Sequence, residues 1–431
     1  MRTALLTLFG CLSLAACSSS PPPETNTSAS SAAATSGGAS SSGAGASSGS
    51  TGAGASTAGA GSSGSTGGSS TGGATSSGSS TGASVQAGSL WIGGANALSP
   101  SELGASSTNP PWAYSCPPVA ALSSPAQGGA EAIDGAGDLW TQFYSSQPSN
   151  GIYMWSPSEL VAGCGSRKPA RTLNTQAELT ALAFDASGNL WGSVTSSNEI
   201  VGYAAANLQS DGSIGPSYLL TSTTGAGVQS IFNPSGLAFD TTNTLWIGNY
   251  YSILAYHTAT LAQATTQSGG NSHVPPDLVL TTSLAAGVES DGGLFNQYVY
   301  QWLAFDSSGD LWVTVQNYLD GGTPEAQIVE YSADQLSNLG GNSTPTPVFT
   351  INQTSAEGAS FPGWSGIAFD ATGNLWGGAH LAAPNLFRFP FASLSTNGTP
   401  DVIITAQGDT TASRAFTLAF DPIPKGLPIK P

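Results

Sequence analysis

The sequence predicts an all-β fold: a six-bladed β-propeller of four-stranded antiparallel blades, closed by pairing of its N- and C-terminal strands. Six Leu-Trp dipeptides recur along the chain, ending at Trp91, Trp140, Trp191, Trp246, Trp312 and Trp376. Five of them follow, by six residues, an Asp that ends a short apolar run: Asp134, Asp185, Asp240, Asp306 and Asp370. A further apolar run ends in Asp421 with no Trp after it, and the first Leu-Trp has no Asp before it. One repeat is therefore split between the two ends of the chain, as closure of a ring of blades requires.

Each repeat begins with signals for a hairpin of two strands. In the second repeat, 182–185 is an apolar run for the innermost strand. The segment Asp-Ala-Ser-Gly-Asn at 185–189 is typical of a tight turn, because the Asp side chain accepts backbone N–H groups and Gly supplies a positive φ. Leu-Trp at 190–191 then begins the second strand. We expect 416–421 to be the innermost strand of a blade whose other three strands come from residues 88–122.

The third and fourth strands have their own signals. The third strand ends in an aromatic residue, and a Leu stands five residues after it in five repeats: Leu160, Leu208, Leu261, Leu336 and Leu394. Pro followed by β-branched residues marks the fourth strand, as at 276–280 and 400–404. In the N-terminal copy, Leu103 takes the place of the Leu and 119–122 is the expected fourth strand.

The N-terminus resembles the signal of a bacterial lipoprotein. A basic start and a short apolar run lead to Leu-Ala-Ala-Cys at 14–17, the sequence at which that family is cleaved and acylated. The resemblance implies a signal peptide at 1–16 and palmitate-type lipid on Cys17, which would anchor the protein to a membrane. Ser18, rather than Asp, follows the Cys, and in that family this favours the outer membrane of the cell envelope.

Residues 17–87 predict a disordered linker after the lipidated Cys. Ser, Gly, Ala and Thr dominate this segment, which has one charged residue, Glu24, and no aromatic residue. Such a segment cannot bury enough apolar surface to offset the entropy lost on ordering. As a flexible coil it has a reach of about 45 Å. The propeller is expected to span 88–431.

Two cysteines remain in the expected propeller, Cys116 and Cys164. An exported chain meets an oxidising compartment, where a pair of cysteines favours a disulfide. Both lie between the Leu after the third strand and the expected fourth strand of neighbouring repeats. We therefore expect them to form a disulfide.

The charge of the chain excludes nucleic acid as a partner. The formal net charge is −17, from 25 Asp and Glu against eight Lys and Arg. No basic stripe offsets the repulsion of a polyanion. The acidic residues are scattered, so we expect them to keep the surface soluble.

The unit Leu-Ala-Phe-Asp-x-x-Gly-Asn-Leu-Trp resembles NHL repeats and the propellers of the gluconolactonase and senescence-marker family. That resemblance implies a divalent metal at the channel mouth, bound by carboxylate and amide side chains five residues before each closing Asp. We call these positions the mouth positions; here they are Gly129, Thr180, Ser235, Gln301, Ser365 and Phe416. None is a carboxylate, and hard divalent cations require charged oxygen ligands, so we expect no metal and no cofactor. Glu131 lies two residues further on and would point inward only if its strand were shifted.

The repeat also resembles that of the streptogramin lyases, propellers that bring two His and a Glu together. The three His of this chain, His257, His273 and His380, are not closely spaced. No catalytic residue is predicted, although a Ser-His-Asp set assembled from distant positions stays open. The repeated Asp residues are interpreted as turn residues, since all serve the same turn.

The longest loops flank the inner hairpin of the fourth repeat, at 281–302 and 314–327, and should meet on one face. The candidate ligand-binding residues at their centre are Asp291, Tyr298, Asn317, Tyr318 and Asp320. Aromatic residues mixed with amides and carboxylates favour a carbohydrate, peptide or protein ligand. We expect a non-enzymatic binding face, and the alternative is a lactonase-like or lyase-like enzyme with its site at the channel mouth.

Overall fold

A computed structural model of the chain describes sixteen segments, all within the compact unit 77–431. They are 86–92, 96–108, 114–115, 127–144, 151–160, 169–175, 177–221, 229–250, 252–264, 273–281, 297–318, 325–352, 363–379, 385–396, 398–405 and 417–421. Among these residues, none of the helices has the length and apolar character needed to cross a bilayer.

The described strands form six sheets, each built on four antiparallel strands that run from the centre outward. We number the blades after the repeats and call the split one the closing blade. Blades one and two contain β5 (Gln127–Ile133), β6 (Leu139–Tyr144), β7 (Gly151–Trp155) and β8 (Arg171–Asn174), then β9 (Leu182–Phe184), β10 (Leu190–Val194), β11 (Glu199–Tyr203) and β13 (Tyr218–Thr221). Blades three and four contain β14 (Leu237–Phe239), β15 (Leu245–Gly248), β16 (Ile253–Tyr256) and β17 (Leu278–Leu280), then β18 (Gln297–Phe305), β19 (Leu311–Tyr318), β20 (Glu325–Tyr331) and β22 (Phe349–Asn352). Blade five and the closing blade contain β23 (Trp364–Phe369), β24 (Leu375–Ala379), β25 (Asn385–Phe389) and β26 (Val402–Thr405), then β27 (Leu418–Asp421), β1 (Ser89–Ile92), β2 (Asn96–Leu98) and β4 (Tyr114–Ser115).

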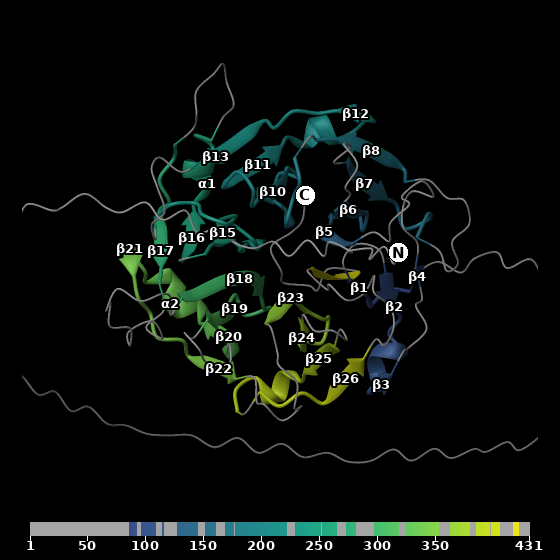
Figure 1. Ribbon diagram of the computed structural model, residues 1–431, viewed down its shortest axis with the longest axis vertical. Helices are drawn as coiled ribbons and strands as arrows, with labels where there is room; N and C mark the ends of the chain where they lie inside the picture. Colours follow the sequence, from purple (N-terminus) through teal and green to yellow (C-terminus); the bar gives the residue numbers. More distant parts are fainter. Residues whose placement is uncertain are drawn as a thin grey trace, which may run out of the picture. The chain divides into compact units, whose positions relative to one another are not determined.

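The predicted ring closure is confirmed. The innermost strands β27, β5, β9, β14, β18 and β23 contact one another in that order and return to β27. In the closing blade, C-terminal β27 pairs with β1, so that Trp91 faces Ala419 (Figure 1). This is the register of the unbroken blades, where Trp191 faces Ala183. Closure removes the two free sheet edges that an open array would present.

The outermost strand of the closing blade is not the predicted one. The strand that pairs with β2 is β4, at Tyr114–Ser115, upstream of the expected 119–122. The segment between β2 and β4 forms an additional strand, β3 (Ser107–Thr108), and the fourth strand of the blade begins after it, at Tyr114. In the sequence, Cys116 directly follows β4 and Cys164 precedes β8. Both cysteines lie outside the described residues.

The repeated Asp residues build the turn between the first and second strands. In five blades one carboxylate oxygen accepts the backbone N–H groups two and four residues later, at 2.8–3.0 Å. The other oxygen accepts the indole N–H of the Trp six residues later, at 2.9–3.2 Å. One Asp side chain thus stabilises the turn and accepts a hydrogen bond from the indole N–H of a buried Trp. The interpretation of these five Asp residues as turn residues is confirmed.

The same Trp residues join neighbouring blades. Each indole meets the Phe that precedes the Asp of the next blade, with ring centroids 5.8–6.3 Å apart: Trp140–Phe184, Trp191–Phe239, Trp246–Phe305, Trp312–Phe369 and Trp376–Phe420. Four pairs meet edge to face, a favourable geometry for aromatic rings, and Trp376–Phe420 is tilted. Trp91 completes the ring of contacts, in one apolar cluster with Ile133 of blade one.

Three additional strands attach one blade to the next. The segment between the third and fourth strands reaches back and pairs in parallel with the outer strand of the preceding blade. These strands are β12 (Gly212–Ser213) on β8, β21 (Gly341–Ser343) on β17 and β3 (Ser107–Thr108) on β26. They cover outer sheet edges at alternate junctions between blades.

The Leu predicted after the third strand belongs to a short helix or turn. The described helices of this kind are η1 (Glu102–Gly104), η2 (Ala205–Leu208), α1 (Thr258–Leu261), α2 (Ala333–Ser337) and η6 (Phe391–Ser393). Leu103, Leu208 and Leu261 are buried there, at 5% exposure or less.

Candidate functional site

A cavity of about 170 Å³ lies on the axis of the ring, where the six innermost strands meet. Five strands line it with the three residues before the repeated Asp, as Glu131-Ala132-Ile133 in blade one, and blade two lines it with Leu182 and Ala183. The middle residue of each triplet is Ala in all six strands: Ala132, Ala183, Ala238, Ala304, Ala368 and Ala419. These small side chains leave space at the centre of the ring.

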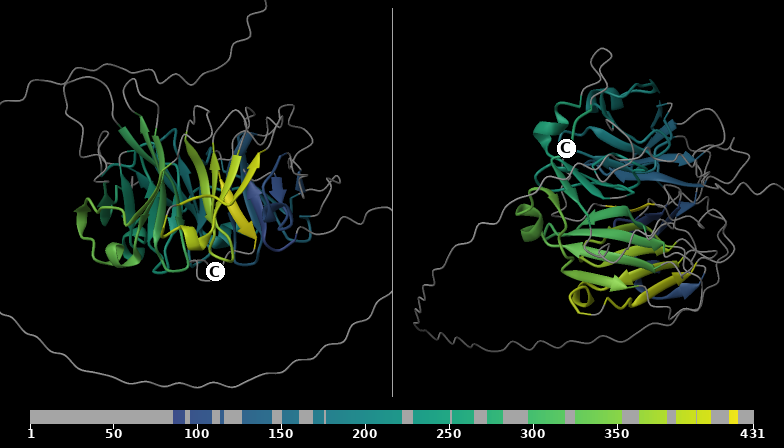
Figure 2. Two further views of the ribbon diagram at one scale, coloured as in Figure 1. Left: turned by 90° about the horizontal axis from the view of Figure 1, so that it is seen from below. Right: turned by 60° about the vertical axis from the view of Figure 1, so that its left-hand side comes forward.

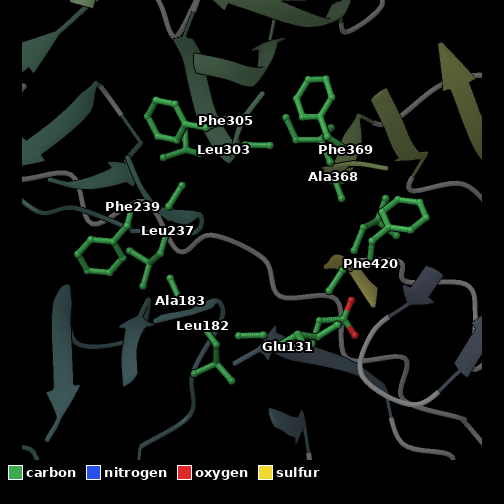
Figure 3. A pocket seen from close by; sticks show the side chains of 17 residues that line it. Glu131, Leu182, Ala183, Leu237, Phe239, Leu303, Phe305, Ala368, Phe369 and Phe420 are labelled. Carbon is green, nitrogen blue, oxygen red and sulfur yellow. The ribbon is translucent and has the colours of Figure 1, made fainter. Parts of the chain in front are cut away.

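Glu131 is the one charged side chain among the described residues that line this cavity. The equivalent position is apolar in the other five strands: Leu182, Leu237, Leu303, Ile367 and Leu418. Glu131 is 5% exposed, and its carboxylate lies at the edge of the cavity on the side of Phe420 (Figure 3). Burying a carboxylate among apolar groups is costly unless it is paired with a cation or a hydrogen-bond donor.

The sequence-based expectation for Glu131 was wrong. No shift of the strand is needed, because Glu131 pairs with Thr141 in the register that pairs Leu182 with Gly192 in blade two. The irregularity in β5 is a bulge between Gln127 and Ala130, which ends before Glu131. The signal was present in the sequence, since Glu131 stands where every other repeat has Leu or Ile.

The mouth positions at the start of these strands belong to a hydrogen-bonded layer between blades. Thr180 Oγ1 and Thr195 Oγ1 are 2.6 Å apart, and Thr195 Oγ1 donates to the carbonyl of Pro234 at 2.6 Å. Ser193 Oγ donates to the carbonyl of Ser235 at 3.1 Å. These bonds connect blade two with blade three at the level of the channel mouth.

Backbone packing closes further parts of this layer. The Gln301 carbonyl lies so near Gly236 and Gly248 that neither could carry a Cβ. Thr417 Oγ1 donates to the carbonyl of Gly129 at 2.7 Å. Phe416 lies outside the described residues. Among the residues described, no group of three His, Cys, Asp or Glu side chains is arranged to hold a metal ion.

The second candidate site is the predicted face beside blade four, where the structure corrects the boundaries of the loops. Much of the expected loops is strand: β18 begins at Gln297, β19 continues to Tyr318, and β20 begins at Glu325. The sequence at 297–300 and 314–318 is rich in Tyr, Val and Thr, which favour strands. The green strands of blade four extend beyond the neighbouring blades (Figure 2, left).

The register of this extension brings three predicted site residues together. Tyr298 pairs with Asn317, and the next pair is Gln297 with Tyr318. A bulge between Tyr300 and Leu303 separates the extension from the ring, and there the N–H of Trp302 donates to Thr314 Oγ1 at 2.9 Å. Asp291 and Asp320 lie outside the described residues, so their place in the site remains a prediction.

Blade four also contains a carboxyl group, that of Glu330, whose pKa is raised strongly. Burial, together with Asp310 and Asp306, raises the pKa of Glu330 to about 7. Glu330 is the cross-strand neighbour of Trp312. Arg388 occupies the equivalent place in blade five, 5.8 Å from the centre of the Trp376 ring. Glu330 lies on β20, the third strand of blade four, away from the cavity and the predicted face.

Comparisons with known proteins find distant similarity of structure. No protein-family model matches the chain, and no curated protein matches its sequence. A structure of catalytically inactive virginiamycin B lyase from Staphylococcus aureus with quinupristin is 11% identical, with a TM-score of 0.34, covering 70% of this chain and 76% of that chain. A protein of unknown function from Bacteroides caccae is also 11% identical, with a TM-score of 0.37, covering 76% of this chain and 85% of that chain.

The C-terminal WD40 domain of Sif2 is 8% identical, with a TM-score of 0.32, over 60% of this chain and 66% of that chain. The assignment of the fold rests on the six sheets and the closed ring of inner strands.

Proposed function

We propose that the protein is a lipid-anchored propeller of the bacterial cell envelope that binds a carbohydrate, peptide or protein ligand on the face extended by blade four, without catalysis. The extension itself carries the proposal. β18, β19 and β20 have nine, eight and seven residues, whereas β9 and β14 have three. Residues held by a strand are positioned more accurately than residues on a loop, which suits a binding surface.

The arrangement of blade four supports the position of the face. Tyr298 and Asn317 are cross-strand partners, so an aromatic residue and an amide lie at one level of the sheet. Aromatic rings give contact area and amides give orientation, a combination found in ligand sites. At this end of blade four β18 begins at Gln297 and β19 ends at Tyr318.

The lipid anchor is tested by metabolic labelling of the full chain with an alkyne analogue of palmitate. We expect the wild type to be labelled and to enter the detergent phase in Triton X-114 partitioning. Cys17→Ala should abolish both. Labelling that persists in Cys17→Ala would contradict the anchor, because the acyl chains would then be attached elsewhere.

The binding face is tested with glycan and peptide arrays probed with the full chain. We expect Tyr318→Ala combined with Asp320→Ala to abolish the signals given by the wild type while leaving the melting temperature nearly unchanged. The matched control is Phe391→Ala combined with Asp334→Ala, which removes an exposed aromatic residue and an exposed acid at the helices that follow the third strands. The control should bind as the wild type does.

The same experiment separates the face from the channel. If binding survives the Tyr318 and Asp320 changes and is lost in variants of Thr180, Ser235 and Gln301, the site lies at the channel mouth. That result would favour the lactonase-like or lyase-like alternative.

A further inference from the structure

The outer edge of a blade presents a backbone N–H that faces away from the sheet, on the second residue of the fourth strand. In blades one, two and five this N–H donates to the segment that follows the third strand of the next blade. The three bonds are Thr172 N–H to Asp211 Oδ1 at 2.7 Å, Leu219 N–H to the Ala264 carbonyl at 3.2 Å, and Ile403 N–H to Ser106 Oγ at 2.9 Å. The next blade therefore covers the outer edge of each of these three blades.

In blade four the residue at this place is Thr350, the second residue of β22, which lies at the rim of the propeller (Figure 1). Its register matches that of Leu219 in blade two. In both blades the residue before the fourth strand donates its N–H to the third-strand residue that faces the first residue of the strand. The N–H and carbonyl of Thr350 therefore face away from β20. Among the residues that the structure describes, none accepts a hydrogen bond from this N–H.

The connection of blade five that lies beside β22 is short. Seven residues lie between Leu394 and β26, against nine between Leu208 and β13, twelve between Leu336 and β22 and ten between Leu103 and β4. The three longer connections are those that form the additional strands β12, β21 and β3 on the preceding blades. Blade five has too few residues in this connection to form such a strand on β22.

The short connection packs on the face of β22. Hydrogen bonds from the N–H groups of Thr396 and Gly398 to the Ser393 carbonyl, at 3.1 and 3.0 Å, turn it back on itself. A Cβ added to Gly398 would lie 2.8 Å from Cγ1 of Ile351, so the chain passes directly over this side chain. Because side chains stand perpendicular to a sheet, the contact is on the face of β22, and the described part of the connection leaves the edge open.

The additional strands of this protein show what such an edge can bind. β12, β21 and β3 are extended segments that add in parallel to β8, β17 and β26, with two or three residues paired. β22 has four residues, the same length as β8 and β26. Asn352 has the place that Thr281 has in blade three, where the Thr281 N–H donates to the Ser343 carbonyl of β21 at 3.0 Å. Blade four thus offers the edge that other blades use, without the strand of its own chain.

We propose that β22, the outer edge of blade four, binds an extended peptide segment of a partner protein, which adds in parallel as a fifth strand. The backbone groups of Thr350 and Asn352 bond to the peptide backbone, and Val348, which is 52% exposed, contacts an apolar side chain of the peptide. In this mode the backbone bonds give affinity and the side-chain contacts give selectivity. The edge is a second surface beyond the proposed function, and it involves neither Tyr318 nor Asp320.

The probe is a phage-displayed library of random dodecapeptides. It is selected on the full chain with Cys17→Ala, which removes the acylation site so that no detergent is needed. The selected pool is then depleted on the same chain carrying Thr350→Pro. Proline removes the outward N–H but none of the bonds to β20, and edge strands tolerate proline when its nitrogen faces solvent. The melting temperature of this variant should therefore stay close to that of the parent.

Two substitutions at one position separate the backbone from the side chain. We expect synthetic copies of the selected peptides to bind Thr350→Pro about tenfold more weakly than the parent, because one backbone hydrogen bond is lost and the proline ring takes its place. Thr350→Val is the matched control: it changes the side chain, keeps the N–H, and should bind as the parent does. Tyr318→Ala combined with Asp320→Ala should also bind these peptides as the parent does, which distinguishes the edge from the face of blade four.

Hydrogen exchange measures the addition of a strand without any substitution. A bound peptide that pairs with β22 should slow exchange of the amide hydrogens of Thr350 and Asn352. A peptide held by side chains alone would leave the exchange of both amides unchanged.

Three results would overturn the proposal. One is a library from which no peptide remains after depletion on Thr350→Pro. Another is a selected peptide that leaves the exchange of the Thr350 and Asn352 amides unchanged. The third is a dimer of the parent chain in sedimentation equilibrium that Thr350→Pro abolishes, because a second copy of the chain would then occupy the edge.

Discussion

Asp370→Ala removes five hydrogen bonds from one turn of blade five. The carboxylate accepts from the backbone N–H and hydroxyl of Thr372, the backbone N–H and side-chain amide of Asn374, and the indole N–H of Trp376, all at 2.7–3.0 Å. Trp376 is 1% exposed, so water cannot readily replace the lost partner of its indole. An unpaired buried donor costs about 1–3 kcal/mol. The exposed turn donors add about 1 kcal/mol, because water replaces most of their loss.

We therefore expect Asp370→Ala to lower the free energy of unfolding by about 2–4 kcal/mol. Urea unfolding of the full chain, followed by tryptophan fluorescence, measures the change. Asp401→Ala is the control: it breaks the ion pair of Asp401 with Arg388 at 2.8 Å, in which the Asp side chain is 42% exposed. An exposed pair contributes less than about 1 kcal/mol. Equal losses in the two variants would refute the reasoning from the buried indole.

The pKa of Asp370 gives the same turn a pH dependence. Burial raises this pKa, but hydrogen bonds from Thr372, Trp376 and Asn374 lower it further, so the net shift is downward. The stabilising contribution is present above the ordinary pKa of 3.8 and is lost as pH falls through the lower folded value. Asp370→Asn should remove this part of the acid sensitivity in urea unfolding at different pH values.

Three further predictions concern other parts of the fold. Because the pKa of Glu330 is raised to about 7, the folded protein keeps a proton that the unfolded chain releases, and stability should fall as pH rises from the ordinary 4.5 to about 7. Glu330→Gln should flatten this slope in urea unfolding, and an unchanged slope would contradict the assignment. Deletion of 414–431 removes β27, so we expect an insoluble or much less stable protein; an unchanged melting transition would count against closure. Thiol labelling of the unfolded, unreduced chain should detect neither Cys116 nor Cys164, and strong labelling of both would end the disulfide prediction.

The architecture could be predicted because its signals are local and repeated. The Asp, the turn and the Trp of one repeat lie within seven consecutive residues, and the structure joins them by hydrogen bonds inside one hairpin. Closure of the ring could also be predicted, because the two halves of the split repeat have to pair to complete one blade. The additional strands β3, β12 and β21 were not predicted, because each is held by an edge that belongs to another repeat.

The candidate sites show where sequence reasoning reached its limit. It identified neutral residues at the mouth positions, and it placed Tyr298, Asn317 and Tyr318 near one another. It misread part of blade four as loops, because strand length there depends on pairing with a partner strand. It also misjudged Glu131, because a bulge in β5 ends before that residue and leaves its register intact.

The sequence by itself determined the repeat, the turn chemistry, the number of blades and the closure of the ring, since these depend on contacts within a repeat or between its two halves. Tertiary structure decided which strands extend, which edges are covered and which side chains meet on the axis. The axial cavity is formed by six strands spread from Glu131 to Phe420, and no local pattern specifies what lies opposite a side chain at the centre. Glu131 is an ordinary acid in its own repeat, and the five apolar strands around it make it the one charged side chain among the described residues that line the axial cavity.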